Sequence, residues 1–410
     1  MEIQRPIRIL DAIKWDQTVQ AQFFERGARE LPPVSRSYYE SRPPSFEPSA
    51  KREELRELER DVQRRLGQFN PVGGILRRMC REYETVVRML EARGTDEFGA
   101  LSKELYGSAQ DAFHAGAPTL ADLGAMMSET LGNVEASMTA PNGEKKIQGE
   151  EAVRVLQEKL DRYFEEPGHP VRVIVSDGII ADAAAGSDYI KLRREATFDE
   201  RELRILEIHE GWVHLGTTLN GLRQPVCTFL SKGPPSSTTT QEGLAVLTEV
   251  LALATHPPRI RRTTNRIVAI DMAERGASFL DVYRFFRDQG FSEPESYGNT
   301  TRVFRGSTPD GQPFTKDIAY SKGFVLTYNF IQLAVRRGLL ARIPLLFCGK
   351  TTLEDNRILA DLVEEGIVLP PRFLPPPFSD LSAIVAWMSY SNFLNRLNLE
   401  RIAADYAGIL

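Results

Sequence analysis

The 410-residue sequence predicts a mostly helical α+β fold with a small antiparallel sheet. Most segments carry apolar residues at helical spacing, whereas strand-like runs occur only at residues 171–175 and 189–193. A capping box, Thr197 with Glu200, then opens a helix that follows the second run directly. We therefore expect the sheet to lie beside that helix.

The segment before residue 170 predicts a layer of helices that carries no evident chemistry. We expect a helix over residues 8–29 and then an extended segment over 32–48, where Pro, Ser and Tyr are frequent. Tyr38 and Tyr39 either pin this segment across the body or leave it as a loose arm. Five further helices are expected at residues 49–66, 72–93, 95–107, 118–131 and 148–166.

The segment after residue 220 alternates predicted helices with irregular stretches. The irregular stretches cover residues 224–240 and the run from Tyr297 to Gly311, both interrupted by Gly, Pro, Ser and Thr. Helices are expected at residues 241–253, 263–275, 278–289, 318–337, 352–364 and 380–406.

The composition excludes some classes of partner. A net charge of −5 at pH 7 and a pI near 5.8 argue against a nucleic-acid-binding surface. Cys80, Cys227 and Cys348 are widely spaced and form no Cys-x-x-Cys pair, which suits a reducing cytosol. No apolar run reaches the roughly 18 residues that a membrane-spanning helix needs. We expect a cytoplasmic protein with neither nucleic acid nor membrane as a partner.

The motif His209-Glu210-x-x-x-His214 is the strongest chemical signal in the sequence. It resembles the zinc-hydrolase motif His-Glu-x-x-His, in which the glutamate is the general base, but it has one extra residue. An ideal helix turns about 100° per residue, so residues five apart lie roughly 140° out of phase. Both histidines bind one zinc ion only if the helix widens locally into a π-bulge, which Gly211 would ease. The alternative is two separate, unrelated histidines.

A catalytic zinc site needs a third protein ligand, for which Glu242 is the first choice. It begins a new helix after an irregular excursion, where a carboxylate is compatible with a helix N-terminus. Glu249, two turns further on, is expected to be an outer partner or a structural residue. His256 and Asp271 remain weaker candidates. The other two histidines are expected to be scattered surface residues: His114 and His169.

Together with Gln241-Glu242-Gly243-Leu244-Ala245, the histidine motif resembles one family over roughly residues 50–410. Its bacterial members are the flavohaemoglobin expression-modulating QEGLA-motif proteins. Its animal members include the microtubule-associated tyrosine carboxypeptidases, which remove the C-terminal tyrosine of α-tubulin. Later elements also match in kind: Arg302-Val303-Phe304-Arg305-Gly306, Phe314-Thr315-Lys316-Asp317, and Tyr320 with Gly323.

The resemblance implies a zinc metallocarboxypeptidase with one zinc ion per chain, held by His209, His214 and Glu242, and with Glu210 as the base. Its partner would be the C-terminus of a protein or peptide, ending in tyrosine or another aromatic residue. The oxyanion of such a reaction needs a donor, for which we expect Tyr320 first and Lys316 second. The α-carboxylate suits the bidentate fork of arginine, for which Arg302 and Arg305 are the candidates by motif, with surface salt bridges as the alternative.

In this interpretation, residues 1–48 form an N-terminal helix and a proline-rich arm, and residues 49–410 form a single catalytic metallopeptidase-like unit. That unit comprises a helical layer (49–168), a zinc-site core (169–340) and C-terminal helices (341–410). The predicted strand Tyr189–Arg193 is either an edge strand that aligns the substrate backbone or an ordinary structural hairpin.

Two other functions are also compatible with the sequence. One is a non-catalytic, zinc-containing regulatory protein that affects flavohaemoglobin expression through protein contacts. The other is a zinc hydrolase that acts on non-peptide amides.

Overall fold

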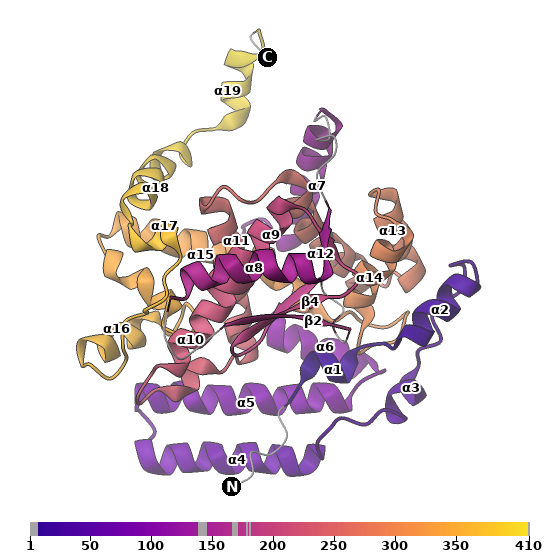
Figure 1. Cartoon of the computed structure of the whole chain (residues 1–410), viewed down its shortest axis with the longest axis horizontal. Coiled ribbons are helices and arrows are strands. Elements are labelled where there is room, and N and C mark those ends of the chain that lie inside the picture. Colours follow the sequence, from indigo (N-terminus) through magenta and orange to yellow (C-terminus); the bar gives the residue numbers. More distant parts are fainter. Residues whose placement is uncertain (1–6, 138–145, 166–170, 178, 180–181, 409–410) are drawn as a thin grey trace. The chain divides into compact units, whose positions relative to one another are not determined.

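A computed structural model describes residues 7–137, 146–165, 171–177, 179 and 182–408. Within them the chain is mostly helical, with one two-stranded and one three-stranded sheet, so the predicted α+β class is confirmed (Figure 1). None of the described helices combines the length and the apolar character required to cross a membrane.

The chain divides into two compact units, and both are discontinuous in sequence. The first contains residues Met1–Gly143, Gly233–Thr239 and Thr255–Lys322. The second contains Glu144–Lys232, Thr240–Ala254 and Gly323–Leu410. The expected partition into an arm at 1–48 and a catalytic unit at 49–410 stays a prediction.

The first unit is built from helices. They are α1 (Ile9–Ile13), α2 (Gln17–Glu25), α3 (Arg36–Glu40), α4 (Pro48–Leu66), α5 (Pro71–Glu91), α6 (Asp96–Tyr106), α7 (Leu120–Ser137), α12 (Pro257–Glu274), α13 (Phe279–Asp288), α14 (Glu293–Phe304) and the short 3₁₀ helix η3 (Thr315–Ile318). Helices α4 and α5 lie side by side, and α7 packs along α12 (Figure 1).

The N-terminal segment is pinned to the first unit rather than loose. The side chain of Tyr39 is 3% exposed. Its hydroxyl accepts hydrogen bonds from Trp15 Nε1 at 2.7 Å and from the Gly306 backbone N–H at 2.9 Å, and it donates to the Ser307 carbonyl at 3.0 Å. The expected single helix over 8–29 is broken into α1 and α2, because the Asp16 side chain caps the N-terminus of α2.

Helix α14 replaces part of the irregular stretch expected from Tyr297 onward, so that prediction is wrong. Ser292 and Glu295 form a reciprocal capping box that starts the helix at Glu293. The box lies before the Gly- and Asn-containing segment that appeared irregular. Its local hydrogen bonds, together with burial of Tyr297 at 5% exposure, outweigh the weak helix propensity of that segment.

The second unit combines helices with both sheets. Its strands are β1 (Ile147–Gln148), β2 (Arg172–Ser176), β3 (Ala183–Ala185), β4 (Tyr189–Arg193) and β5 (Thr197–Phe198). Its helices are α8 (Gly149–Tyr163), α9 (Glu200–Leu206), the π-helix η1 (Glu207–Leu215), α10 (Gly216–Leu222), η2 (Thr228–Ser231), η4 (Leu340–Arg342), η5 (Pro344–Phe347), α16 (Asn356–Glu364), α17 (Pro376–Ser379), α18 (Ser382–Leu394) and α19 (Leu399–Tyr406). Helices α11 (Pro235–Leu251) and α15 (Ala319–Arg336) contribute residues to both units.

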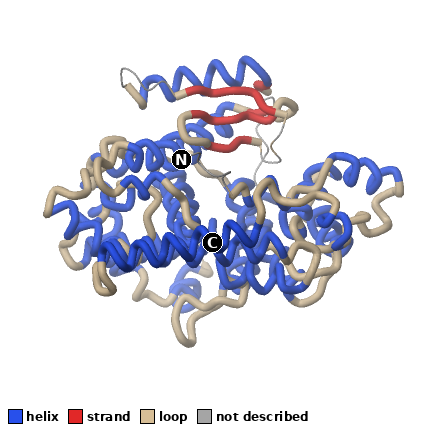
Figure 2. The backbone as a smooth tube through the Cα atoms, turned by 90° about the horizontal axis from the view of Figure 1, so that it is seen from below, coloured by secondary structure: helices blue, strands red, loops and turns tan. Residues whose placement is uncertain are grey.

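The three-stranded sheet is mixed and has the strand order β2-β4-β3. Strand β4 pairs in parallel with β2 and antiparallel with β3. The expected edge strand Tyr189–Arg193 is therefore the central strand, and β3, a run of three alanines, forms an edge. Helix α8 packs against β2, while η1 packs against β3 and β4. Figure 2 shows the three strands (red) side by side, with a helix along the outer one.

The cap that starts the helix after the sheet differs from the expected one. Asp199, not Thr197, is the N-cap, and it forms a capping box with Glu202. Thr197 and Phe198 instead form β5, where Phe198 is buried and pairs with Ile147 of β1. Burial of an aromatic side chain thus favours a separate short strand, paired with β1, directly before the helix.

Two other helix boundaries differ from the expected ones. Helix α11 begins at Pro235, inside the stretch 224–240 that was expected to be irregular, because proline is well suited to the first helical position. The expected helix 380–406 is interrupted between α18 and α19, where Asn398 caps the second helix.

Helices α11 and α15 cross within the second unit at a pair of glycines. A Cβ atom placed on Gly243 would overlap the main-chain atoms of Gly323. Leu244 and Ala245, which follow Gly243, are fully buried in a core with Ile331 of α15. The glycine of the Gln-Glu-Gly-Leu-Ala string therefore sets the close approach of two backbones.

We expect Gly243→Ala to lower the free energy of unfolding by roughly 1–3 kcal/mol, because the added methyl group meets backbone that cannot move aside. Urea unfolding measures this change. Gly132→Ala is the matched control: it lies within α7 with open space around its Cβ position, and it should raise stability by roughly 0.5–1 kcal/mol. Equal stabilities of Gly243→Ala and wild type would contradict the close-approach argument.

Candidate metal centre

The segment that carries both histidines is a π-helix, η1, as the five-residue spacing predicts. Gly216 N–H donates to the carbonyl of Gly211, five residues earlier, which is the hydrogen bond of a widened turn. The rings of His209 and His214 consequently lie 4.8 Å apart between centroids and at 90° to each other. The widened turn of the π-helix thus accommodates the extra residue of the motif.

Gly211 has a second role in this segment. A Cβ atom there would collide with the side chain of Leu160, a fully buried residue of α8. The absence of a side chain lets α8 pack directly against the widened turn. Gly211 therefore eases the local helix distortion and also makes room for the helix that covers it.

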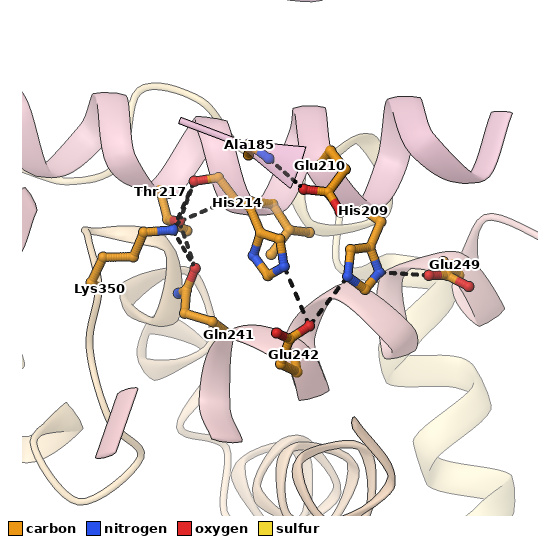
Figure 3. A network of polar contacts seen from close by, with 10 residues as sticks. Ala185, His209, Glu210, His214, Thr217, Gln241, Glu242, Glu249 and Lys350 are labelled. Atoms are coloured by element: carbon orange, nitrogen blue, oxygen red, sulfur yellow. Dashed lines mark hydrogen bonds and ion pairs between the residues drawn. The ribbon is translucent and has the colours of Figure 1, made fainter. Parts of the chain in front are cut away.

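Three potential ligand atoms converge on one point (Figure 3). His209 Nε2 lies 3.3 Å and His214 Nε2 lies 3.4 Å from Glu242 Oε2. Bonds of about 2.0–2.1 Å to a zinc ion, meeting at a tetrahedral angle, separate ligand atoms by roughly 3.3–3.4 Å. Among the described residues, these three form a group that is able to hold a metal ion, with all ligand atoms within 4.8 Å of one another.

Glu249 orients His209 through Nδ1, the ring nitrogen that does not face Glu242. Its Oε1 lies 2.7 Å from His209 Nδ1, and a carboxylate only accepts, so Nδ1 carries the proton. If the imidazole is neutral, Nε2 carries a lone pair that faces the Glu242 carboxylate. Because the two repel each other, this arrangement needs a positive charge between them. Burial alone lowers the pKa of His209, but its hydrogen bonds with Glu242 and Glu249 outweigh burial and raise the pKa to about 10.

Glu210 follows the first histidine and points toward the sheet. Its Oε2 accepts a hydrogen bond of 2.9 Å from the backbone N–H of Ala185, at the edge strand β3 (Figure 3). The carboxylate is therefore held by the main chain of β3.

The remaining candidates are not part of this group. His256 is the N-cap residue of α12, and Asp271 accepts hydrogen bonds from Arg275 and Gln110, all in the first unit. His114 is exposed, as expected. The other expected surface histidine, His169, lies outside the described residues.

A family model described as microtubule-associated tyrosine carboxypeptidase matches residues 21–396. The chain belongs to this family. The search of curated proteins found no match to the chain. The family is one of carboxypeptidases, which are hydrolases, and this supports the classification of the chain as an enzyme.

Lys350 also belongs to the polar network around the two histidines. Its Nζ donates to the His214 carbonyl at 2.8 Å, Thr217 Oγ1 at 3.1 Å and Gln241 Oε1 at 2.9 Å (Figure 3). Burial lowers the pKa of Lys350 to about 8, although Glu242 and Glu210 act in the opposite direction. A single lysine after a glycine forms no motif, so no sequence pattern indicates this residue.

The other predicted site residues gather in the first unit around Asp317, which is 3% exposed. Arg302 Nε donates to Asp317 at 2.6 Å. Arg266 and Arg305 each lie 3.8 Å from the same carboxylate. Burial raises the pKa of Asp317, but the three arginines outweigh it and hold the pKa well below its usual range.

Positive charge exceeds negative charge in this Asp317 cluster. Burial and the neighbouring Arg302 lower the pKa of Arg266 and of Arg305 to about 10. The guanidinium of Arg266 also lies 4.9 Å from the centroid of the Tyr320 ring. Lys316 adds a further charge that acts on Asp317. Arg305 itself is 3% exposed, so it is not one of the surface salt bridges that the sequence left open.

We expect Glu249→Leu to weaken zinc binding by about 10–100-fold, because loss of an outer partner frees the imidazole that it orients. Chelator competition measures the affinity. Glu249→Gln keeps an acceptor for His209 Nδ1 and should lose much less. An unchanged affinity in Glu249→Leu would show that Glu249 does not orient the ligand.

Proposed function

We propose that the protein is a zinc-dependent metallocarboxypeptidase that removes a C-terminal residue, tyrosine or another aromatic, from a protein or peptide. The observation that carries the proposal is the convergence of two imidazole nitrogens and one carboxylate oxygen, His209, His214 and Glu242, on one point. Membership of a carboxypeptidase family supports the reaction class.

One zinc ion per chain would be held by these three residues. Zinc at such a site polarises the scissile carbonyl and lowers the pKa of water. The donor set fits zinc because two nitrogens and one oxygen match its preferences, and three protein ligands are typical of catalytic rather than structural sites.

Glu210 is proposed as the general base. Its Oε2 is held by the Ala185 N–H, so the carboxylate has a fixed orientation, and Oε1 is the atom proposed to accept a proton from the attacking water. The same group then delivers the proton to the leaving amine. A well-positioned acid–base group of this kind contributes about 10²–10⁴-fold to the rate.

Recognition of the substrate α-carboxylate is assigned to Arg302 and Arg305. The Nε atoms of Arg266 and Arg305 are buried and find no hydrogen-bond partner among the residues that the structure describes, and one aspartate faces three guanidinium groups. This excess of positive charge supports binding of an anion. Tyr320, with Lys316 as the second choice, remains the proposed donor to the oxyanion.

The expected substrate is a protein or peptide C-terminus. The family description names tyrosine as the released residue, and the chain is proposed to share a preference for tyrosine or another aromatic. The net charge of −5 does not favour an acidic tail as substrate, so a tubulin tail is not the first expectation. Assaying peptides that differ only in their last residue tests the preference.

The rival functions predict other outcomes. A non-catalytic zinc protein would bind zinc and trim no peptide, and structural zinc usually has four protein ligands, whereas three converge among the described residues. A hydrolase of non-peptide amides would be inactive on every peptide of the C-terminal series while cleaving small amides.

We expect the purified protein to contain about one zinc ion per chain, and His209→Ala to lose it. Glu210→Gln should keep the zinc and lower peptide trimming by about 10²–10⁴-fold, because it removes only the base. Elemental analysis and a peptide-release assay measure the two effects. A metal-free wild type would refute the zinc enzyme, and full activity in Glu210→Gln would exclude this residue as the base.

We expect Arg302→Met to raise KM for peptides with a free C-terminus at least about tenfold, because a charged hydrogen bond of about 1.5–3 kcal/mol is lost. The ratio of kcat/KM for free and C-terminally amidated peptides should fall in the variant. An unchanged ratio would remove Arg302 from carboxylate recognition. Because Arg305 is buried, Arg305→Met should in addition lower thermal stability.

A further inference from the structure

Lys350 uses its full hydrogen-bonding capacity inside the second unit. An ammonium group has three N–H donors, and Lys350 directs them to three neutral oxygens, those of His214, Thr217 and Gln241. The three acceptors come from η1, α10 and α11. One side chain therefore ties together the helices that supply the proposed metal ligands.

The first acceptor is the main-chain carbonyl of a ligand residue. Besides Lys350 at 2.8 Å, the His214 carbonyl accepts from Thr217 Oγ1 at 3.1 Å and from Thr218 Oγ1 at 2.8 Å. His214 lies near the end of the π-helix, where the widened turn returns to the α form. Carbonyls displaced by such a bulge need other donors. For the His214 carbonyl, three side chains are these donors.

The second anchor is the residue before the carboxylate ligand. Gln241 Oε1 accepts from Lys350 Nζ at 2.9 Å and from Thr217 Oγ1 at 2.8 Å. Because Gln241 directly precedes Glu242, this contact fixes the start of the ligand-bearing part of α11 relative to η1. This contact is a structural role for Gln241, the first residue of the Gln-Glu-Gly-Leu-Ala string.

We propose that Lys350 is the positioning residue of the metal centre: by bridging the His214 carbonyl and Gln241, it sets the separation of His214 and Glu242. The inference rests on the proposed metal site. Lys350 touches neither the ligand atoms nor the substrate in this role, and it acts through the two residues that it connects. Its removal loosens the site rather than deleting a ligand.

Lys350→Met tests the proposal because it keeps the length of the side chain and removes its three donors. We expect zinc affinity, measured by chelator competition, to fall about 10–100-fold. Hydrogen exchange of the backbone over residues 207–222 should become faster. Lys51→Met is the matched control, since Lys51 is also a buried lysine, at 8% exposure, in a helix that carries no ligand, and it should change neither measurement.

Thr217→Val is a second variant for the case in which Lys350→Met fails to fold. It removes one hydroxyl from the same network without changing side-chain size and should weaken zinc binding by about two- to tenfold. Lys350→Arg retains a charged donor and should recover part of the affinity. The proposal is overturned if Lys350→Met binds zinc with the wild-type affinity. If Lys350→Met does not fold, the same result for Thr217→Val overturns it.

The two proposals fail in different ways. A wild type that binds zinc but trims no peptide refutes the proposed function, while the affinity series still tests Lys350. A wild type that binds no zinc also refutes the proposed function. Exchange over residues 207–222 then decides the positioning role, and equal exchange in Lys350→Met and wild type overturns it.

Discussion

The widened turn of η1 is the constraint on which the rest of the candidate metal centre depends. With five residues from His209 to His214, an ideal α-helix would direct the two rings apart. The π-helix brings them to one point, but it weakens the regular hydrogen-bond pattern of the helix. Neighbouring elements compensate: Leu160 packs on Gly211, and side-chain donors satisfy the His214 carbonyl.

The parts of the centre that sequence predicts are those with a local geometric rule. The spacing of the histidines requires a π-bulge, and the structure contains it. Glu242 and Glu249 are two turns apart on one helix, so both reach the same histidine, one at each ring nitrogen. The motif and the first-choice carboxylate therefore name the three residues that the structure brings together, His209, His214 and Glu242.

The parts that sequence does not predict depend on contacts between distant segments. Strand β4 alternates buried and half-buried residues, a pattern that fits an edge or a central strand equally well, and only its pairing with β2 and β3 distinguishes them. Lys350 reaches η1 from a segment more than a hundred residues away, with no periodicity to reveal it. The capping boxes at Ser292 and Asp199 show how a local polar contact moves a helix boundary.

The hydrogen bond from the Ala185 N–H to Glu210 has a consequence for how the site tolerates genetic change. The donor belongs to the main chain, so every substitution at position 185 retains it except proline, which has no N–H. The proposed metal ligands, in contrast, are each lost by a single change of side chain. The orientation of the proposed base is thus buffered against point mutation, and drift in the alanine-rich edge strand leaves it in place provided that the strand keeps its pairing with β4.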